Sequence, residues 1–209
     1  MGYLIFDTET NGLPQCKAYG FFPPYTQTEK YAGARVVQVS YIITNEVYTK
    51  LEESDTIIKM DDFKITNSEF HGITEHISET QGITFQEFAK GFSNSLDFVH
   101  TIVAHNLNFD FNVICAELYR YGFHDIITKL ESKKQICTMK RYKNLVCATF
   151  KSGTGSFKGE PSLRFKDPNL KELYTFATGE VMENHHNSMY DVLNLHKAVK
   201  LLEMKFNLT

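Results

Sequence analysis

Closely spaced strand-like segments fill the first sixty residues of the chain and constrain its fold more than any other feature. Residues 3–6 form a short apolar run, residues 36–44 are rich in β-branched side chains, and shorter runs follow at 47–51 and 56–60. Because parallel neighbours need connections of a dozen residues or more, this spacing predicts an antiparallel meander. The proline- and aromatic-rich segment between the first two strands is too broken for a helix, and we expect it to be functional.

Helical periodicity takes over from residue 84. Phe85, Phe88, Phe92 and Leu96 recur at the spacing of a buried helix face. The pattern then predicts a short strand at 101–104, a helix at 109–121 with Asn108 as N-cap, a helix at 170–178 ended by Gly179, and a last helix from about residue 187. Strands followed by alternating helices and strands indicate an α/β fold, a mixed β-sheet flanked by α-helices, in a single domain covering residues 1–209.

Charge is distributed unevenly along the chain. The formal net charge of -3 excludes a globally basic nucleic-acid binder. Residues 129–171, however, hold eleven basic and three acidic side chains, and the loop 151–158 within them is basic and rich in small residues. Two interpretations remain open, an anionic polymer lying along this region or an ordinary solvated face.

The chain lacks the sequence signals of membrane or secreted proteins. No apolar stretch approaches the roughly 20 residues that a membrane helix needs. We expect no signal peptide, because the first residues run directly into a strand-like segment without a basic region and a long apolar one. Four scattered cysteines form no CxxC pair and are typical of reduced thiols. We therefore expect an intracellular protein, cytoplasmic or nuclear.

Asp7 and Glu9 are the strongest chemical signal. They are two residues apart at the end of the first strand, so the period of two places both carboxylates on one face. Two acids side by side on an apolar strand repel each other, which predicts a cation between them. Gly12 and Pro14 supply the turn that ends the strand. The alternative is a polar strand end that enters a loop.

Two further segments each carry an acid at the start of a helix. Asp110 lies in the first turn of a helix, where a lone acid is usually a capping charge. Asp191 lies near the start of the last helix, and His186 can approach it only from the preceding loop. Taken together, the four acids predict hard oxygen ligands for two Mg²⁺ or Mn²⁺ ions. Such a pair, roughly 3.5–4 Å apart, can clamp a scissile phosphate while a histidine takes a proton from water.

Three motifs that carry these residues resemble those of the DEDDh family of 3′→5′ exonucleases, which is DnaQ-like. This family includes the proofreading exonuclease, RNase T, oligoribonuclease and the TREX enzymes. The motifs are FDTETNGLP at 6–14, HNLNFDFNVICAEL at 105–118 and HNSMYD at 186–191. Their order and spacing are specific, and weaker similarities between them extend the resemblance over nearly the whole chain. The resemblance implies a ribonuclease H-like fold.

The resemblance also implies roles for individual residues. Asp7, Glu9, Asp110 and Asp191 would bind the metal ions, and His186 would be the general base, since its spacing from Asp191 distinguishes it from His185. The residues that would contact the terminal nucleotide are Thr10, Leu13, Asn106 and Phe109. Asn11 departs from the threonine that the family often has, which could alter contacts to the terminal sugar.

The expected function is metal-dependent 3′→5′ exonuclease activity that releases nucleoside 5′-monophosphates from single-stranded or frayed ends. DNA is favoured over RNA by analogy with the opening motif, which would suit proofreading or DNA repair. The alternatives are an RNA 3′-end-trimming exoribonuclease and a non-catalytic nucleic-acid-binding or polymerase-docking module. A polymerase partner and a homodimer stay open, and no membrane association is expected.

Overall fold

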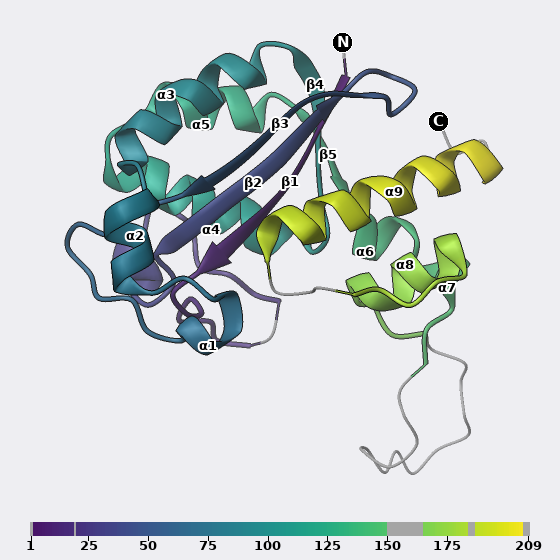
Figure 1. Cartoon of the computed structure of the whole chain (residues 1–209), viewed down its shortest axis with the longest axis horizontal. Helices are drawn as coiled ribbons and strands as arrows, with labels where there is room; N and C mark the ends of the chain where they lie inside the picture. Colours follow the sequence, from purple (N-terminus) through teal and green to yellow (C-terminus); the bar gives the residue numbers. More distant parts are fainter. Residues whose placement is uncertain (1, 19, 150–164, 184–186, 207–209) are drawn as a thin grey trace.

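The computed structural model describes residues 2–18, 20–149, 165–183 and 187–206, and these form a five-stranded mixed sheet between helices (Figure 1). The strand order is β3-β2-β1-β4-β5. β1 pairs antiparallel with β2, β2 pairs antiparallel with β3, and β4 pairs parallel with both β1 and β5. The antiparallel start and the α/β class predicted from the sequence are therefore confirmed.

The elements follow in chain order. The strands are β1 (Gly2–Thr10), β2 (Val36–Thr44), β3 (Lys50–Ile57), β4 (Val99–Ala104) and β5 (Lys134–Cys137), with a 3₁₀ helix at Thr28–Tyr31. The helices are α1 (Ser68–His71), α2 (Glu75–Gln81), α3 (Phe85–Leu96), α4 (Leu107–Arg120), α5 (His124–Glu131), α6 (Thr138–Arg141), α7 (Lys143–Val146), α8 (Leu170–Thr178) and α9 (Ser188–Phe206).

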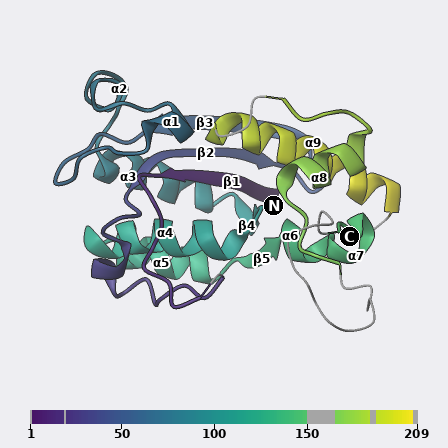
Figure 2. The same ribbon diagram turned by 90° about the horizontal axis from the view of Figure 1, so that it is seen from below.

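The sheet has an apolar core on each face because buried side chains of its central strands point alternately to the two faces. Leu4 and Phe6 of β1 pack with α3, α4 and α5, whereas Ile5 packs with α8 and α9 on the other side. Figure 2 shows α4 and α5 on one side of the strands and α8 and α9 on the other. The helical spacing of α3 and the apolar seam of α9 are both buried, as the sequence predicted. Asp7 and Glu9 follow Ile5 in the same alternation, which directs them toward α9.

The sequence prediction was wrong for the hairpin after β2. It gave two short strands at 47–51 and 56–60, whereas the structure has the single strand β3. The Asn45 side chain accepts hydrogen bonds from the backbone N–H groups of Val47 and Thr49, and Tyr48 has a positive φ of 57°. These local bonds form a tight turn, so Val47 cannot belong to a strand.

The predicted start of the helix after β4 was also wrong. α4 begins at Leu107, and Asn106 is the N-cap in the left-handed conformation with φ of 68°. Asn108 instead donates from Nδ2 to the carbonyl of Gly20, 3.3 Å away. Asparagine tolerates the left-handed region better than most residues, which allows the sharp turn between β4 and α4.

A buried ion cluster joins the start of β2 to α4. Arg35 is 4% exposed, and its Nε lies 2.5 Å from Oε1 of Glu117, which is 3% exposed. The guanidinium also pairs with Asp61 and Asp62 and lies over the ring of Phe63. The backbone carbonyl of Arg35 accepts a hydrogen bond from Asn11 just after β1. The cluster thereby supports the end of the strand that carries the acids.

No helix in the described part of the chain is both long and apolar enough to cross a bilayer.

Candidate active site

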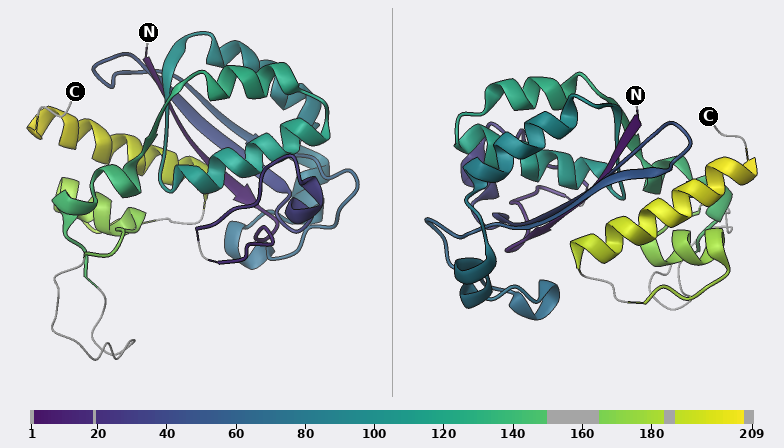
Figure 3. Two further views of the ribbon diagram at one scale, coloured as in Figure 1. Left: turned by 180° about the vertical axis from the view of Figure 1, so that it is seen from behind. Right: turned by 45° about the horizontal axis from the view of Figure 1, so that its top comes forward.

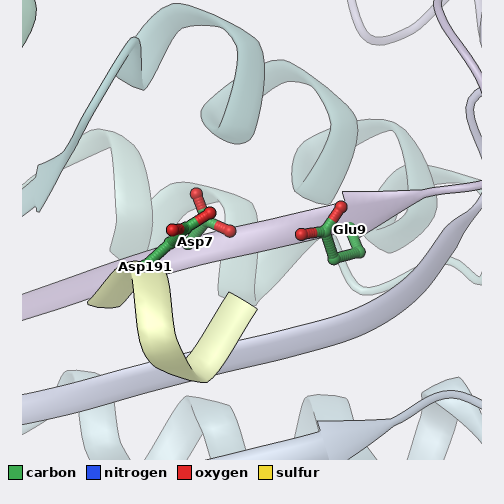
Figure 4. A group of neighbouring side chains, drawn as sticks. All are labelled: Asp7, Glu9 and Asp191. Carbon is green, nitrogen blue, oxygen red and sulfur yellow. The ribbon is translucent and has the colours of Figure 1, made fainter. Parts of the chain in front are cut away.

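Three carboxylates converge beside the end of β1. Asp7 and Glu9 project from β1, and Asp191 comes from the first turn of α9. One ligand oxygen from each lies within 4.8 Å of the others. Figure 4 shows the carboxyl groups of Asp7 and Asp191 next to each other and Glu9 further along the strand. The period-two placement of the acids and the convergence with the last helix thus agree with the sequence.

A hydrogen bond fixes the start of α9 to the strand. The hydroxyl of Ser188 is fully buried and donates to the backbone carbonyl of Asp7 at 2.9 Å. Ser188 precedes Asp191 by three residues, about one helical turn. This bond therefore fixes the position of Asp191 along β1, beside Asp7 and Glu9.

Asp110 reaches the site from the opposite face of the sheet. It is 2% exposed, and its Oδ1 accepts hydrogen bonds from the backbone N–H of Thr8 at 3.1 Å and from the Thr8 hydroxyl at 2.9 Å. Thr8 lies between Asp7 and Glu9 and points to the α4 side of β1. The sequence interpretation missed this role for Thr8, although the same alternation that pairs the two acids sends the residue between them toward α4.

Burial and mutual repulsion perturb the acids. The pKa of Asp7 is raised well above its ordinary value by burial and by the charges of Asp110, Glu9 and Asp191. Burial, then Asp191 and Asp110, raises the pKa of Glu9 to about 7. Burial also raises the pKa of Asp110 to about 7, against the opposing effect of the Thr8 hydrogen bonds. Crowded carboxylates of this kind fit a hard divalent cation such as Mg²⁺ or Mn²⁺, which would offset the repulsion.

The perturbed acids predict an unusual dependence of stability on pH when no metal is bound. Acids with a raised pKa hold protons in the folded chain that the unfolded chain has already released. The free energy of unfolding should therefore fall as pH rises from about 4 to 7, by about 1–3 kcal/mol. Urea unfolding in EDTA at pH 5 and pH 8 measures this change, and added Mg²⁺ or Mn²⁺ should restore stability at pH 8.

Glu9→Gln is the matched variant for that experiment. Its amide does not titrate, so the loss of stability toward pH 8 should be smaller than in the wild type. The replacement Glu52→Gln, on the exposed surface of β3, should leave the dependence unchanged. A wild-type stability that stays level or increases over this range would contradict the repulsion among the carboxylates.

A cavity of about 680 Å³ opens between the β1–β2 loop and α4. Three of the residues expected to contact the terminal nucleotide line it, namely Leu13, Asn106 and Phe109. The remaining lining residues come from the β1–β2 loop, from α4, from the end of β5 with α6, and from the segment before α8. They are Pro14, Cys16, Ala18, Gly20, Phe21, Phe22, Asn108, Cys137, Met139, Lys140 and Asp167. Leu13 is 78% exposed, which leaves its side chain available to a ligand.

Two residues at the end of β1 have structural partners instead. The Thr10 hydroxyl donates to the carbonyl of Gly12 at 2.7 Å, and Thr10 does not line the cavity. Asn11 is 8% exposed and donates from Nδ2 to the carbonyl of Lys64, while its Oδ1 accepts the N–H of Thr66 at 2.5 Å. The side chain of Asn11 therefore anchors the loop before α1.

His105, at the start of the second motif, is a structural residue. Its Nδ1 lies 3.0 Å from the Thr138 hydroxyl and its Nε2 lies 3.0 Å from the carbonyl of Pro168. Burial lowers the pKa of His105 to about 4, so the ring stays neutral. It fastens β4 to the segments that carry Met139 and Asp167 on the far wall of the cavity.

Two sequence-based expectations lie outside the described residues. These are the role of His186, with its neighbour His185, and the basic loop 151–158.

Comparison with known proteins places this arrangement in context. No curated protein matches the chain in sequence. Among solved structures, E. coli exonuclease I in complex with a dA16 oligonucleotide superposes with a TM-score of 0.70 at 22% identity, over 99% of this chain and 41% of that one. Exonuclease I from Methylocaldum szegediense gives a TM-score of 0.68 at 18% identity, over 99% and 41% of the two chains.

The chain thus spans about two fifths of the length of these exonucleases. Their likeness shows that the fold is the ribonuclease H-like one expected from the motifs. Residues 4–199, from β1 through most of α9, match the RNase T family model, which describes exonucleases. The chain therefore belongs to the RNase T-type, DnaQ-like exonuclease family that its three motifs resemble.

Proposed function

We propose that this chain is a metal-dependent 3′→5′ exonuclease that releases nucleoside 5′-monophosphates from single-stranded or frayed 3′ ends, with DNA as the favoured polymer. The observation that carries the proposal is the convergence of Asp7, Glu9 and Asp191 within 4.8 Å beside Asp110. Residues 1–209 act in this proposal as a single exonuclease domain. Exonuclease I of E. coli in complexes with single-stranded DNA supports the choice of polymer by analogy.

In this proposal the four acids hold two divalent ions, Mg²⁺ or Mn²⁺. When bound, such ions supply an activated water and stabilise the leaving oxygen. Asp7 and Glu9 approach from the α9 face of β1 and Asp110 from the α4 face, so the strand end positions donors on both sides. Burial around Asp110 keeps bulk water away from this side of the site.

The cavity receives the terminal nucleotide. Phe109 offers an aromatic face for the base, and Leu13 and Asn106 stand beside it. The cavity also contains Lys140, whose ammonium group pairs with Asp167 on the same wall. Because phosphate contacts release counterions, affinity should weaken as salt increases.

The deciding experiment uses 5′-labelled DNA and RNA oligonucleotides of matched sequence with Mg²⁺ or Mn²⁺. A product ladder that shortens from the 3′ end, with nucleoside 5′-monophosphates released, supports the proposal, and the faster substrate identifies the polymer. Faster RNA shortening would favour the exoribonuclease. Circular DNA, which has no 3′ end, is the control, and its cleavage would contradict an exonuclease. Binding without shortening of any substrate would favour a non-catalytic module.

His186 is proposed as the general base that takes the proton from the attacking water. His186→Ala should lower kcat by about 10²–10⁴, the usual scale for loss of a general base. Single-turnover rates across pH 6–9 measure this loss. His185→Ala is the matched control and should stay near the wild-type rate. A loss that follows His185→Ala instead would assign the role to that neighbour.

A further inference from the structure

A second cavity is formed within the β1–β2 loop, next to the cavity proposed to receive the terminal nucleotide, which is called the terminal cavity below. It has a volume of about 410 Å³ and shares three lining residues with the terminal cavity, Cys16, Phe21 and Phe22. These three residues therefore form a shared wall between the two cavities, each of which is within the size range of ligand sites. Figure 3 (left) shows this purple segment beside the arrowhead of β1, at the strand end that carries the acids.

The wall is held in place by contacts with α4. Asn108 donates from Nδ2 to the carbonyl of Gly20, and the ring of Phe22 meets the ring of Phe109 edge-on at 5.8 Å. Gly20 has a φ of +78°, which few other residues adopt, and the backbone N–H of Phe21 donates to the carbonyl of Ala18. These contacts fix the tip of the loop against the terminal cavity.

The tip presents an exposed aromatic ring. Phe21 is 74% exposed although it borders both cavities. An exposed ring of this kind can stack on the base of a bound nucleotide, and stacking does not depend on which base is present. The neighbouring ring of Phe22 is engaged with Phe109 and is less exposed, so Phe21 is the available surface.

Positive charge lines the second cavity. Lys17 and Lys30 both border it, and among the described residues no acid does. Within the same described part of the chain, neither lysine forms an ion pair, whereas Lys140 of the terminal cavity pairs with Asp167. Cations beside an exposed aromatic ring match a nucleotide, which carries a phosphate and a base.

We propose that this second cavity is a subsite for an upstream nucleotide of the same strand, whose base stacks on Phe21 and whose phosphate lies near Lys17 and Lys30. The inference rests on the proposed function, since the strand enters from the terminal cavity across the shared wall. In this proposal, contacts with the β1–β2 loop make binding depend on the length of the substrate. Dinucleotides occupy the terminal cavity alone, and longer strands gain the second contact.

Catalysis on a length series tests this subsite. The wild-type kcat/KM should increase from dinucleotide to tetranucleotide. In Phe21→Ala, kcat/KM for the tetranucleotide should fall by about 5- to 150-fold, the scale of one lost base stack, and by more than kcat/KM for the dinucleotide, which can meet Phe21 only in the terminal cavity. Phe98→Ala is the matched control, because Phe98 is 67% exposed and precedes β4 at the opposite end of the sheet. Equal losses at both lengths, or none, would overturn the subsite.

The lysines give an independent measurement. Lys17→Gln combined with Lys30→Gln should flatten the salt dependence of tetranucleotide kcat/KM by roughly one unit of slope per lysine, with little effect on the dinucleotide. Lys90→Gln on α3 is the control. An unchanged slope would remove the phosphate contact from the proposal.

A fluorescence measurement of binding tests the subsite without relying on catalysis. The sequence contains no tryptophan, so Phe21→Trp introduces a single reporter. With EDTA present, a tetranucleotide should quench its fluorescence more strongly than a dinucleotide, and Phe98→Trp should respond to neither. A wild-type chain that shortens no substrate would contradict the proposed function, whereas a Phe21→Trp reporter that no oligonucleotide quenches would contradict the subsite.

Discussion

Asp7→Asn should reduce the rate of 3′-end cleavage by at least about 10³-fold while the fold remains intact. The change keeps the size of the side chain and removes one charged oxygen donor from the carboxylate group. Stabilisation of transition-state charge by bound metal is worth several kcal/mol, and each 1.4 kcal/mol is a factor of ten in rate. Single-turnover cleavage of a 5′-labelled oligonucleotide at saturating Mg²⁺ or Mn²⁺ gives the measurement.

Stability distinguishes a ligand from a structural residue in this variant. Because the charges of Asp110, Glu9 and Asp191 all raise the pKa of Asp7, removal of its charge should leave the metal-free protein as stable as the wild type or more stable. Asp125→Asn at the exposed start of α5 is the control and should leave the cleavage rate unchanged. Cleavage within tenfold of the wild-type rate would remove Asp7 from the metal site.

Arg35→Ala should destabilise the protein by about 3–5 kcal/mol. The substitution leaves Glu117 buried without its main partner, and burial already raises the pKa of that acid. It also removes the pairs with Asp61 and Asp62 and the stacking on Phe63. Urea unfolding followed by circular dichroism measures the loss.

Two companion variants show whether the buried charge is the cause. Arg35→Met combined with Glu117→Leu removes both charges and should recover part of the lost stability. Lys50→Ala breaks the exposed pair with Glu53 and should cost less than about 1 kcal/mol. If the double variant is less stable than Arg35→Ala, the cost comes from packing instead of from an unpaired charge.

Periodicity explains which parts of the fold could be predicted. Residues that repeat every two or every three to four positions must face the same way, so the faces of β1, α3 and α9 follow from the sequence alone. The pairing of Asp7 and Glu9 rests on the same rule. Their convergence with Asp191 came from the recognised motifs and is present in the structure.

Long-range contacts explain what could not be predicted. Asn11 bonds to Lys64 and Thr66 more than fifty residues away, and no local pattern indicates this. Asn108 was expected to cap α4 because asparagine favours that position. Its side chain instead donates a hydrogen bond to the carbonyl of Gly20, which is distant in sequence. Local propensity decides only where tertiary contacts do not compete.

The distribution of the acids along the chain has a consequence for synthesis. Asp7 and Glu9 leave the ribosome early, whereas Asp191 and the Ser188 hydroxyl that fixes its position along β1 belong to the last helix. A nascent chain that ends before α9 holds the first acids without the partner that completes the cluster. In the proposed nuclease, the cluster of acids therefore forms only after α9 has been synthesised.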